Sequence, residues 1–261
     1  MYTKKTLVAA VLLALGSGLA QATPAFVSSG FDPTPSHPST SQPVSTTSSS
    51  YLAQQALRGQ FNGGSFTTFG FERSEGVFIA DGLPQDAVFG AVTATITAGS
   101  GTLMNQAEEG RYNTTTGGSQ YLRIQAAAGS DIASSFRVNF DADISAFGFY
   151  ATDVGDFEGT LKLVLRDSSD TVLDTLTVRD ASANAALSGS LLFFGFADRS
   201  VAYRSVTFLT TGSNDYFGFD DFVVGTAANL KEPTLPEPTS LALTGLALAA
   251  AGFAARRTRP A

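Results

Sequence analysis

The sequence predicts an all-β protein, an antiparallel two-sheet β-sandwich or jelly roll, flanked by an N-terminal signal peptide and a C-terminal transmembrane-type helix. Three observations support the all-β body. The 261 residues include 21 Phe and 26 Gly, and only 15% are charged. Such a composition is typical of strands joined by tight turns. The apolar runs are short, and no long amphipathic helix interrupts them.

The first 22 residues have the pattern of a secretory signal peptide. Two lysines precede an apolar run at residues 7–15, and Ala20 and Ala22 form a small-x-small cleavage site. This order of charge, apolar stretch and small residues is the one that signal peptidase processes. We therefore expect residues 1–22 to be removed during export.

Residues 23–50 are rich in Ser, Thr and Pro. This composition predicts an extended linker, because it offers too few apolar side chains for a core. A single β-sandwich domain is expected at residues 51–228, beginning with one or two helical turns at residues 51–58. A second linker is expected at residues 229–235.

Alternating apolar and polar side chains indicate the strands of this domain. Leu161, Leu163 and Leu165 point to one face, while Lys162 points to the other. Residues 167–170, Asp-Ser-Ser-Asp, predict a hairpin turn. Strands are predicted at residues 66–71, 76–80, 88–97, 121–125, 135–140, 144–151, 161–166, 172–178, 191–196, 201–209 and 217–224.

The last 26 residues, 236–261, form a second tripartite signal. The triplet Pro-Glu-Pro is followed by a largely apolar stretch, residues 239–255, and then by a basic end. A helix over that stretch would be about 26 Å long, just short of a hydrocarbon core. The residues of the motif and of the basic end are Pro236, Glu237, Pro238, Arg256, Arg257 and Arg259.

This combination resembles the C-terminal sorting signal of PEP-CTERM proteins, a family of bacterial surface and extracellular-matrix proteins. The resemblance implies cleavage by a membrane protease, an exosortase, near the Pro-Glu-Pro, and at least transient anchoring by the helix. A permanent single-span anchor is the alternative. Segments of the body, residues 113–122, 146–156, 193–196 and 218–222, are similar to the β-sandwich bodies of that family, which implies a lectin-like sandwich.

The composition also excludes several classes of function. The formal net charge of −7 argues against a nucleic-acid partner, which needs a basic surface. The chain has no Cys and one His, so thiolate chemistry and most zinc sites are excluded.

Acidic residues in loops and at strand ends suggest a structural calcium site, since Ca²⁺ takes six to eight oxygen ligands. The candidate ligands are Glu72, Asp153, Asp156, Asp220 and Asp221. The alternative is that these acids cap turns and keep the sheets soluble. Strict alternation along residues 217–224 would point one of the two last aspartates inward, unless a bulge intervenes.

We expect a non-catalytic, structural or adhesive protein of the cell surface or extracellular matrix, with an exopolysaccharide as partner. The alternative is an extracellular glycoside hydrolase that uses Asp141 with Asp153, or Asp153 with Glu158, as paired carboxylates. Phe-rich stretches are expected in the core, so tyrosines are the better sugar contacts. These are Tyr112, Tyr121, Tyr150, Tyr203 and Tyr216.

Overall fold

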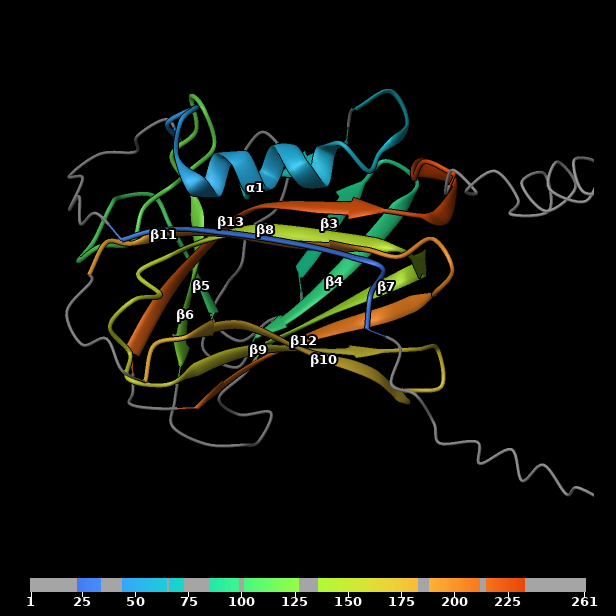
Figure 1. Ribbon diagram of the computed structural model, residues 1–261. Helices are drawn as coiled ribbons and strands as arrows, with labels where there is room; N and C mark the ends of the chain where they lie inside the picture. Colours follow the sequence, from blue (N-terminus) through green and yellow to red (C-terminus); the bar gives the residue numbers. More distant parts are fainter. Residues whose placement is uncertain are drawn as a thin grey trace, which may run out of the picture.

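A computed structural model confirms the all-β architecture with two antiparallel sheets packed face to face (Figure 1). The structure describes residues 23–33, 44–64, 66–72, 85–98, 101–126, 136–182, 188–211 and 215–232. The predicted signal peptide, the sorting signal and the strand at residues 76–80 lie outside these ranges. Within them, no helix is both long and apolar enough to cross a membrane.

The first sheet has six strands in the order β10-β9-β12-β7-β4-β3, and every neighbouring pair is antiparallel. The bounds are β3 Gln85–Phe89, β4 Val92–Ala98, β7 Phe136–Ile144, β9 Thr160–Arg166, β10 Val172–Asp180 and β12 Tyr203–Thr211.

The second sheet has seven strands, ordered β1-β11-β8-β13-β6-β5, with β2 also paired to β13. The bounds are β1 Phe26–Asp32, β2 Thr68–Phe69, β5 Gly101–Met104, β6 Tyr121–Ala126, β8 Ala146–Thr152, β11 Leu191–Ala197 and β13 Asp215–Gly225.

One helix, α1 (Ser49–Arg58), lies on the outer face of the seven-stranded sheet (Figure 1). It begins two residues before the predicted helical turns. The Ser48 hydroxyl accepts a hydrogen bond from the Tyr51 N–H at 3.2 Å, and the Asp32 carboxylate accepts from the N–H groups of Ser49 and Ser50 at 2.7 and 2.9 Å. The end of β1 therefore caps the helix.

The linker prediction for residues 23–50 was wrong at β1. This strand is an edge strand that pairs with β11 along its whole length. Its sequence is FVSSGFD, and the two residues that are buried, Ser28 and Gly30, are both small. A Cβ on Gly30 would stand 2.0 Å from the Ser49 carbonyl oxygen, so only glycine fits there.

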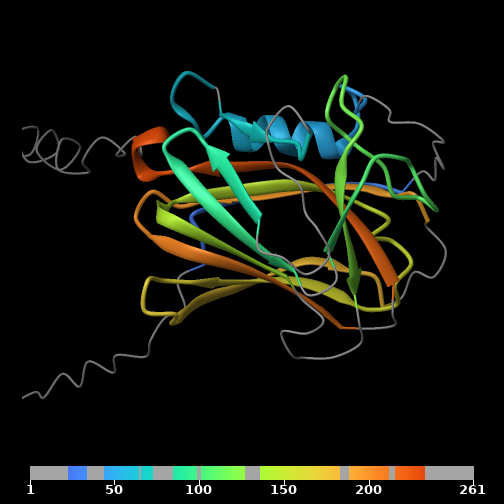
Figure 2. The same cartoon turned by 180° about the vertical axis from the view of Figure 1, so that it is seen from behind.

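The single strand predicted at residues 88–97 is a hairpin, β3–β4, which turns at Gly90 (Figure 2). Gly90 has a positive φ of 62°, which glycine adopts without strain. The strand predicted at residues 66–71 shortens to the two residues of β2, and β5 was not predicted.

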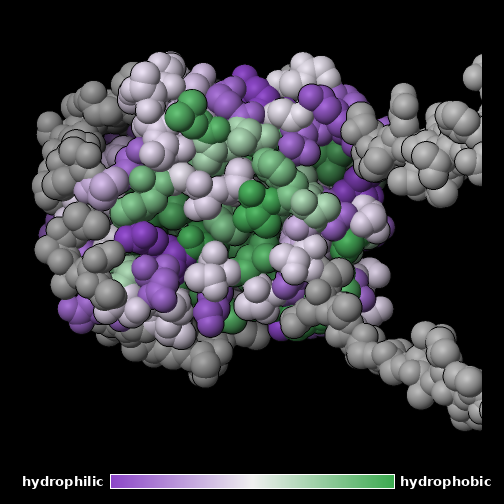
Figure 3. Space-filling view, viewed as in Figure 1, coloured by the Kyte–Doolittle hydropathy of each residue, from purple (hydrophilic) through white to green (hydrophobic). Residues whose placement is uncertain are grey.

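Phenylalanine fills the space between the sheets, as expected. The Phe208 ring stacks on Phe136 at 4.0 Å and meets Phe149 and Phe219 edge to face at 4.9 and 5.2 Å. At the edge between β1 and β10, the Arg179 guanidinium lies 3.7 Å from the centroid of the Phe31 ring. Some hydrophobic residues are also exposed near the middle of the face that Figure 3 shows.

A notch of two glycines seats the helix on the seven-stranded sheet. Gly148 of β8 and Gly195 of β11 are direct cross-strand partners. A Cβ on either would lie 2.7 Å from Cδ2 of Leu57, which is completely buried. Because these two positions have no side chain, Leu57 can approach the sheet backbone more closely than it could if either residue were larger than glycine.

The two ends of the described body meet at one end of the sandwich. The Ala25 N–H donates to the Asp198 carboxylate at 3.1 Å, and the neighbouring Arg199 guanidinium donates to the Leu230 carbonyl oxygen at 2.6 Å. Residues 24–26 and 230–232 therefore leave the body beside the same turn after β11.

We expect Gly195→Ala to destabilise the fold by about 1–3 kcal/mol, because the added methyl group collides with Leu57 and Phe193. Leu57→Ala alone should cost about 2–5 kcal/mol. The double variant should lose less than the sum, since removing the leucine side chain makes room for the methyl. Urea unfolding of the three variants measures this coupling, and strict additivity would contradict the notch.

Candidate functional site

A β-bulge in β13 points both late aspartates to the outer side of the seven-stranded sheet. The pairing of β13 with β8 shifts register between Asp220 and Val223, and Asp221 has a positive φ of 47°. Phe219 and Phe222 on either side both face the core. The bulge, which was one of the two alternatives left open by the sequence, therefore resolves the strand phase.

The two carboxylates fasten the loop at residues 113–116 to β13. Oδ2 of Asp220 accepts hydrogen bonds from the N–H groups of Thr114 and Thr115 at 2.6 and 3.1 Å. The Thr114 hydroxyl lies within reach of both carboxylates, at 3.0 Å from Asp220 and 3.1 Å from Asp221. The Thr115 hydroxyl donates to Asp221 at 2.7 Å.

Glu72 binds the second half of the same loop. Its Oε1 accepts from the Asn113 side-chain amide and from the N–H groups of Ser119 and Gln120, at 2.8, 2.8 and 2.9 Å. A Cβ on Gly118 would lie 2.2 Å from that oxygen, so a larger residue there would displace the Glu72 carboxylate. The structure thus brings Glu72, Asp220 and Asp221 to one loop, as the sequence suggested, and shows them accepting hydrogen bonds from it.

Burial dominates the ionisation of this pair. It raises the pKa of Asp220 well above the usual value, and the charge of Asp221 acts in the same direction. Burial also raises the pKa of Asp221, against the lowering effect of the two threonine hydroxyls. The hydrogen bonds from Thr114 favour the ionised form of Asp220, so they oppose the effect of burial.

Asp153 lies in a separate network, in which its cationic partner is an arginine. Oδ2 accepts from the Arg111 guanidinium at 3.0 Å, and Oδ1 accepts from the Gly189 N–H at 2.9 Å. Arg111 also pairs with Glu109 at 3.0 Å and lies over the Tyr216 ring. Burial raises the pKa of Asp153 to about 6, although Gly189 and Arg111 lower it.

The five predicted calcium ligands therefore divide into two groups. Asp156 belongs with Asp153, since its charge raises the pKa of that residue. Among the described residues, no group of three or more His, Cys, Asp or Glu side chains is arranged to hold a metal ion. Calcium binding stays a prediction of the sequence, and the hydrogen bonds support the alternative in which the acids fasten loops.

The three carboxylates of the alternative hydrolase lie in different surroundings. Asp141 belongs to β7 of the six-stranded sheet and accepts from the Thr93 N–H at 2.8 Å. Asp153 follows β8 of the other sheet, where both of its oxygens are engaged. The loop residue Glu158 has a positive φ of 52° and is exposed.

The outer face of the six-stranded sheet carries rows of polar side chains across the strands. One row runs Thr175, Val164, Thr207, Arg137 and Thr97 in direct register. The next runs Arg166, Ser205, Asn139, Thr95 and Asp86. Since side chains alternate along a strand, the apolar partners of these rows fill the core.

A shallow groove of about 410 Å³ crosses this face beside the β9–β10 turn. Arg137 donates to the Asp170 carboxylate at 2.5 Å, and Arg166 donates to the Asp170 carbonyl oxygen at 2.9 Å. The Nε atoms of both arginines are buried without a hydrogen-bond partner. The groove, called the arginine groove below, is lined by the guanidinium groups of Arg137 and Arg204, which Asp170 and Asp143 hold in place.

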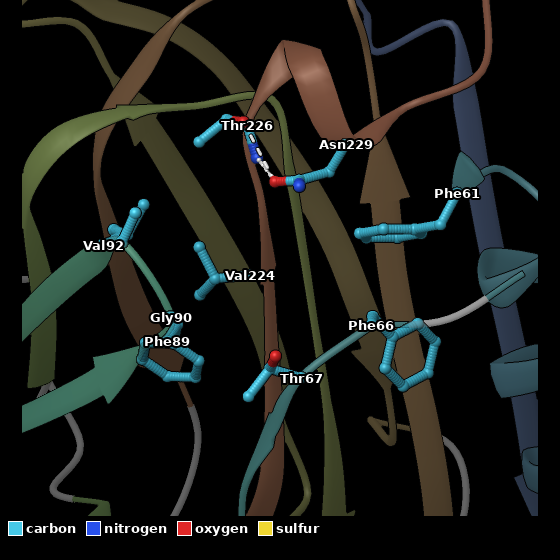
Figure 4. Close-up of a pocket in the computed structure, with 10 residues that line it drawn as sticks. Phe61, Phe66, Thr67, Phe89, Gly90, Val92, Val224, Thr226 and Asn229 are labelled. Carbon is cyan, nitrogen blue, oxygen red and sulfur yellow. Dashed lines mark hydrogen bonds between the residues drawn. The ribbon is translucent and has the colours of Figure 1, made fainter. Parts of the chain in front are cut away.

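A hollow of about 380 Å³ lies where the β3–β4 turn meets the end of β13 (Figure 4). Phe61 and Phe66 face each other on one side with ring centroids 5.4 Å apart. The Thr226 N–H and hydroxyl both donate to Oδ1 of Asn229, at 2.8 and 2.9 Å, and so satisfy each other's polar groups. The lining of this hollow therefore combines aromatic rings with the polar side chains of Thr67, Thr226 and Asn229.

No protein-family model and no curated protein matches the chain. Solved structures with some similarity include the K2 cleaved adhesin domain of Lys-gingipain, at 15% identity and a TM-score of 0.38, covering 62% of this chain and 100% of the other. A family 29 carbohydrate-binding module has 12% identity and a TM-score of 0.28, covering 65% and 94%.

A third similar structure is TmCBM61 in complex with β-1,4-galactotriose, at 11% identity and a TM-score of 0.28, covering 52% of this chain and 89% of the other. At these identities and TM-scores, the similarities assign neither a family nor a function to the chain.

The raised carboxyl pKa values predict that mild acid stabilises the fold. A carboxyl whose pKa is higher in the folded than in the unfolded chain adds stability when it is protonated. This stability is fully present below the unfolded pKa and is lost as the pH rises through the folded pKa. For Asp153, a change from 3.8 to about 6 corresponds to about 3 kcal/mol. Asp215, Asp220 and Asp221 act in the same direction. The melting temperature should therefore increase when the pH is lowered from 7.5 to 5.

Asp153→Asn should flatten this dependence, because an amide does not titrate. Asp170→Asn is the matched control, since the Arg137 hydrogen bond lowers the pKa of Asp170 and that residue titrates below this pH range. A melting temperature that falls from pH 7.5 to pH 5 in the unmodified chain would contradict the assignment.

Proposed function

We propose that this chain is an exported, non-catalytic protein of the cell surface or extracellular matrix that binds neutral polysaccharide. Signal peptidase and an exosortase process its two ends, and the segment at residues 239–255 holds it in the membrane at least until the second cleavage. The polar outer face of the six-stranded sheet is the observation that carries the binding part of the proposal.

That face suits a neutral polysaccharide for two reasons. Its rows present hydroxyl, amide and guanidinium groups, which exchange hydrogen bonds with sugar hydroxyls. Arg137 and Asn139 stand in neighbouring rows at the arginine groove, where Asp167 and Asp170 balance the positive charge. A strongly anionic polymer would meet these acids, as well as the overall charge of −7.

The meeting of the two ends supports display from a surface. Residues 24–26 and 230–232 lie together after β11, so the N-terminus left by cleavage and the C-terminal anchor segment would both leave from one end of the sandwich. The rest of the body would then project away from the attachment point.

We expect Arg137→Ala combined with Asn139→Ala to weaken binding to the best neutral ligand of a glycan array about tenfold or more. Each lost hydrogen bond costs roughly 0.5–1.5 kcal/mol, and 1.4 kcal/mol is a factor of ten. The full-length chain with Lys231→Ala, which removes an exposed cation at the attached end, is the control. Absence of glycan binding by the unmodified chain would overturn this part.

Sorting is tested separately by the intact mass of the chain expressed in a bacterium that has an exosortase. We expect the mature form to lack residues 1–22 and to end near the Pro-Glu-Pro motif. Pro236→Ala with Pro238→Ala should leave the chain uncleaved in the membrane fraction. A cytosolic polypeptide that retains both ends would overturn the export proposal.

A further inference from the structure

A hollow of about 310 Å³ lies between α1, the loop at residues 113–116 and the bulge in β13. One side of the helix lines it with Tyr51, Gln54 and Arg58, whose spacing of three and four residues places them on one face. The hollow is within the size range of small-molecule sites, at its lower end.

Tyr150 supplies the observation that points to a ligand. Its side chain comes from β8 into the lining of the hollow, and the residue is only 2% exposed. Its hydroxyl has no hydrogen-bond partner in the structure. A buried hydroxyl without a partner costs roughly 1–3 kcal/mol, and a ligand group that bonded to it would recover that cost.

The other walls are also polar. Thr68, Thr114, Thr115 and Thr116 line the hollow, together with the carboxylate of Asp221. Carboxylate and amide groups bind sugar hydroxyls, and tyrosine rings pack against the apolar face of a sugar ring. A purely apolar ligand would leave the Tyr150 hydroxyl without a partner, and an anion would lie against Asp221.

The walls are held in place before any ligand arrives. Asp220 fixes the N–H groups of Thr114 and Thr115, and the Thr115 hydroxyl is bonded to Asp221. Leu57 locks the helix into the glycine notch of Gly148 and Gly195. A site whose walls are fixed in this way loses little entropy on binding.

We propose that this hollow, called the helix hollow below, binds one neutral sugar unit and that the Tyr150 hydroxyl forms a hydrogen bond with it. The ligand class rests on the proposed function. The helix hollow is separate from the arginine groove, because it lies on the outer side of the other sheet. The protein would then have a site for a single sugar beside α1, in addition to the face that binds a polysaccharide chain.

Tyr150→Phe tests the proposal, because it removes only the hydroxyl. The probes are the methyl glycosides of glucose, galactose, mannose and xylose, titrated calorimetrically against the full-length chain. We expect at least one to bind and the variant to bind it at least tenfold more weakly. The melting temperature should stay unchanged or rise, since the lost hydroxyl had no partner.

Tyr203→Phe is the matched control. The Tyr203 hydroxyl is also buried and unpartnered, but its ring packs on Phe196 in the core between the sheets. This variant should bind the sugar as the unmodified chain does. Arg58→Ala, an exposed position on the helix, is the second variant and should also weaken binding.

Two results would overturn the proposal: no glycoside binds, or Tyr150→Phe binds as tightly as the unmodified chain. The variant with Arg137→Ala and Asn139→Ala separates this result from the proposed function. It should keep monosaccharide binding while losing polysaccharide. Loss of both activities in that variant would contradict two separate sites.

Discussion

The hydrogen bonds that Asp220 accepts are the constraint on which the outer side of the seven-stranded sheet depends. A buried carboxylate needs donors, and two successive backbone N–H groups of the 113–116 loop provide them. The adjoining bulge turns Asp221 to the same side, where it binds the loop through a threonine hydroxyl. Without this attachment the loop would have no fixed position beside α1, and the helix hollow would lose one wall.

The two sheets use their outer faces differently. The seven-stranded sheet has an apolar area on its outer side as well as its inner side, and α1 covers that area with Ala53, Leu57 and Phe61. The glycine notch makes this cover close enough to exclude water. The six-stranded sheet carries polar rows instead, so it needs no cover. The part of the seven-stranded sheet under α1 is therefore closed to a ligand. Polar side chains are accessible instead on the outer face of the six-stranded sheet and in the hollow beside α1.

Much of the architecture could be predicted from the sequence, because inward Phe and Leu alternate with outward polar residues in the central strands. β1 could not, since its composition reflects the small space beneath α1 rather than a need for apolar burial. The hairpin at Gly90 was missed because apolar residues continue through the turn. The sequence grouped Glu72 with the late aspartates only as candidate calcium ligands, together with Asp153 and Asp156, which lie elsewhere. Their donors, and the Arg111 partner of Asp153, come from a loop without regular periodicity, so only the tertiary structure reveals them.

The route by which the chain leaves the sandwich has a mechanical consequence. The C-terminal exit follows β13, which is hydrogen-bonded to β8 on one side and to β6 and β2 on the other. Tension applied through an anchored tail would load those ladders along the strand direction, so many bonds would have to fail together. Pulling on an edge strand would instead break its bonds one after another. If the tail is anchored as we propose, force on the body would therefore act along a strand that is bonded on both sides.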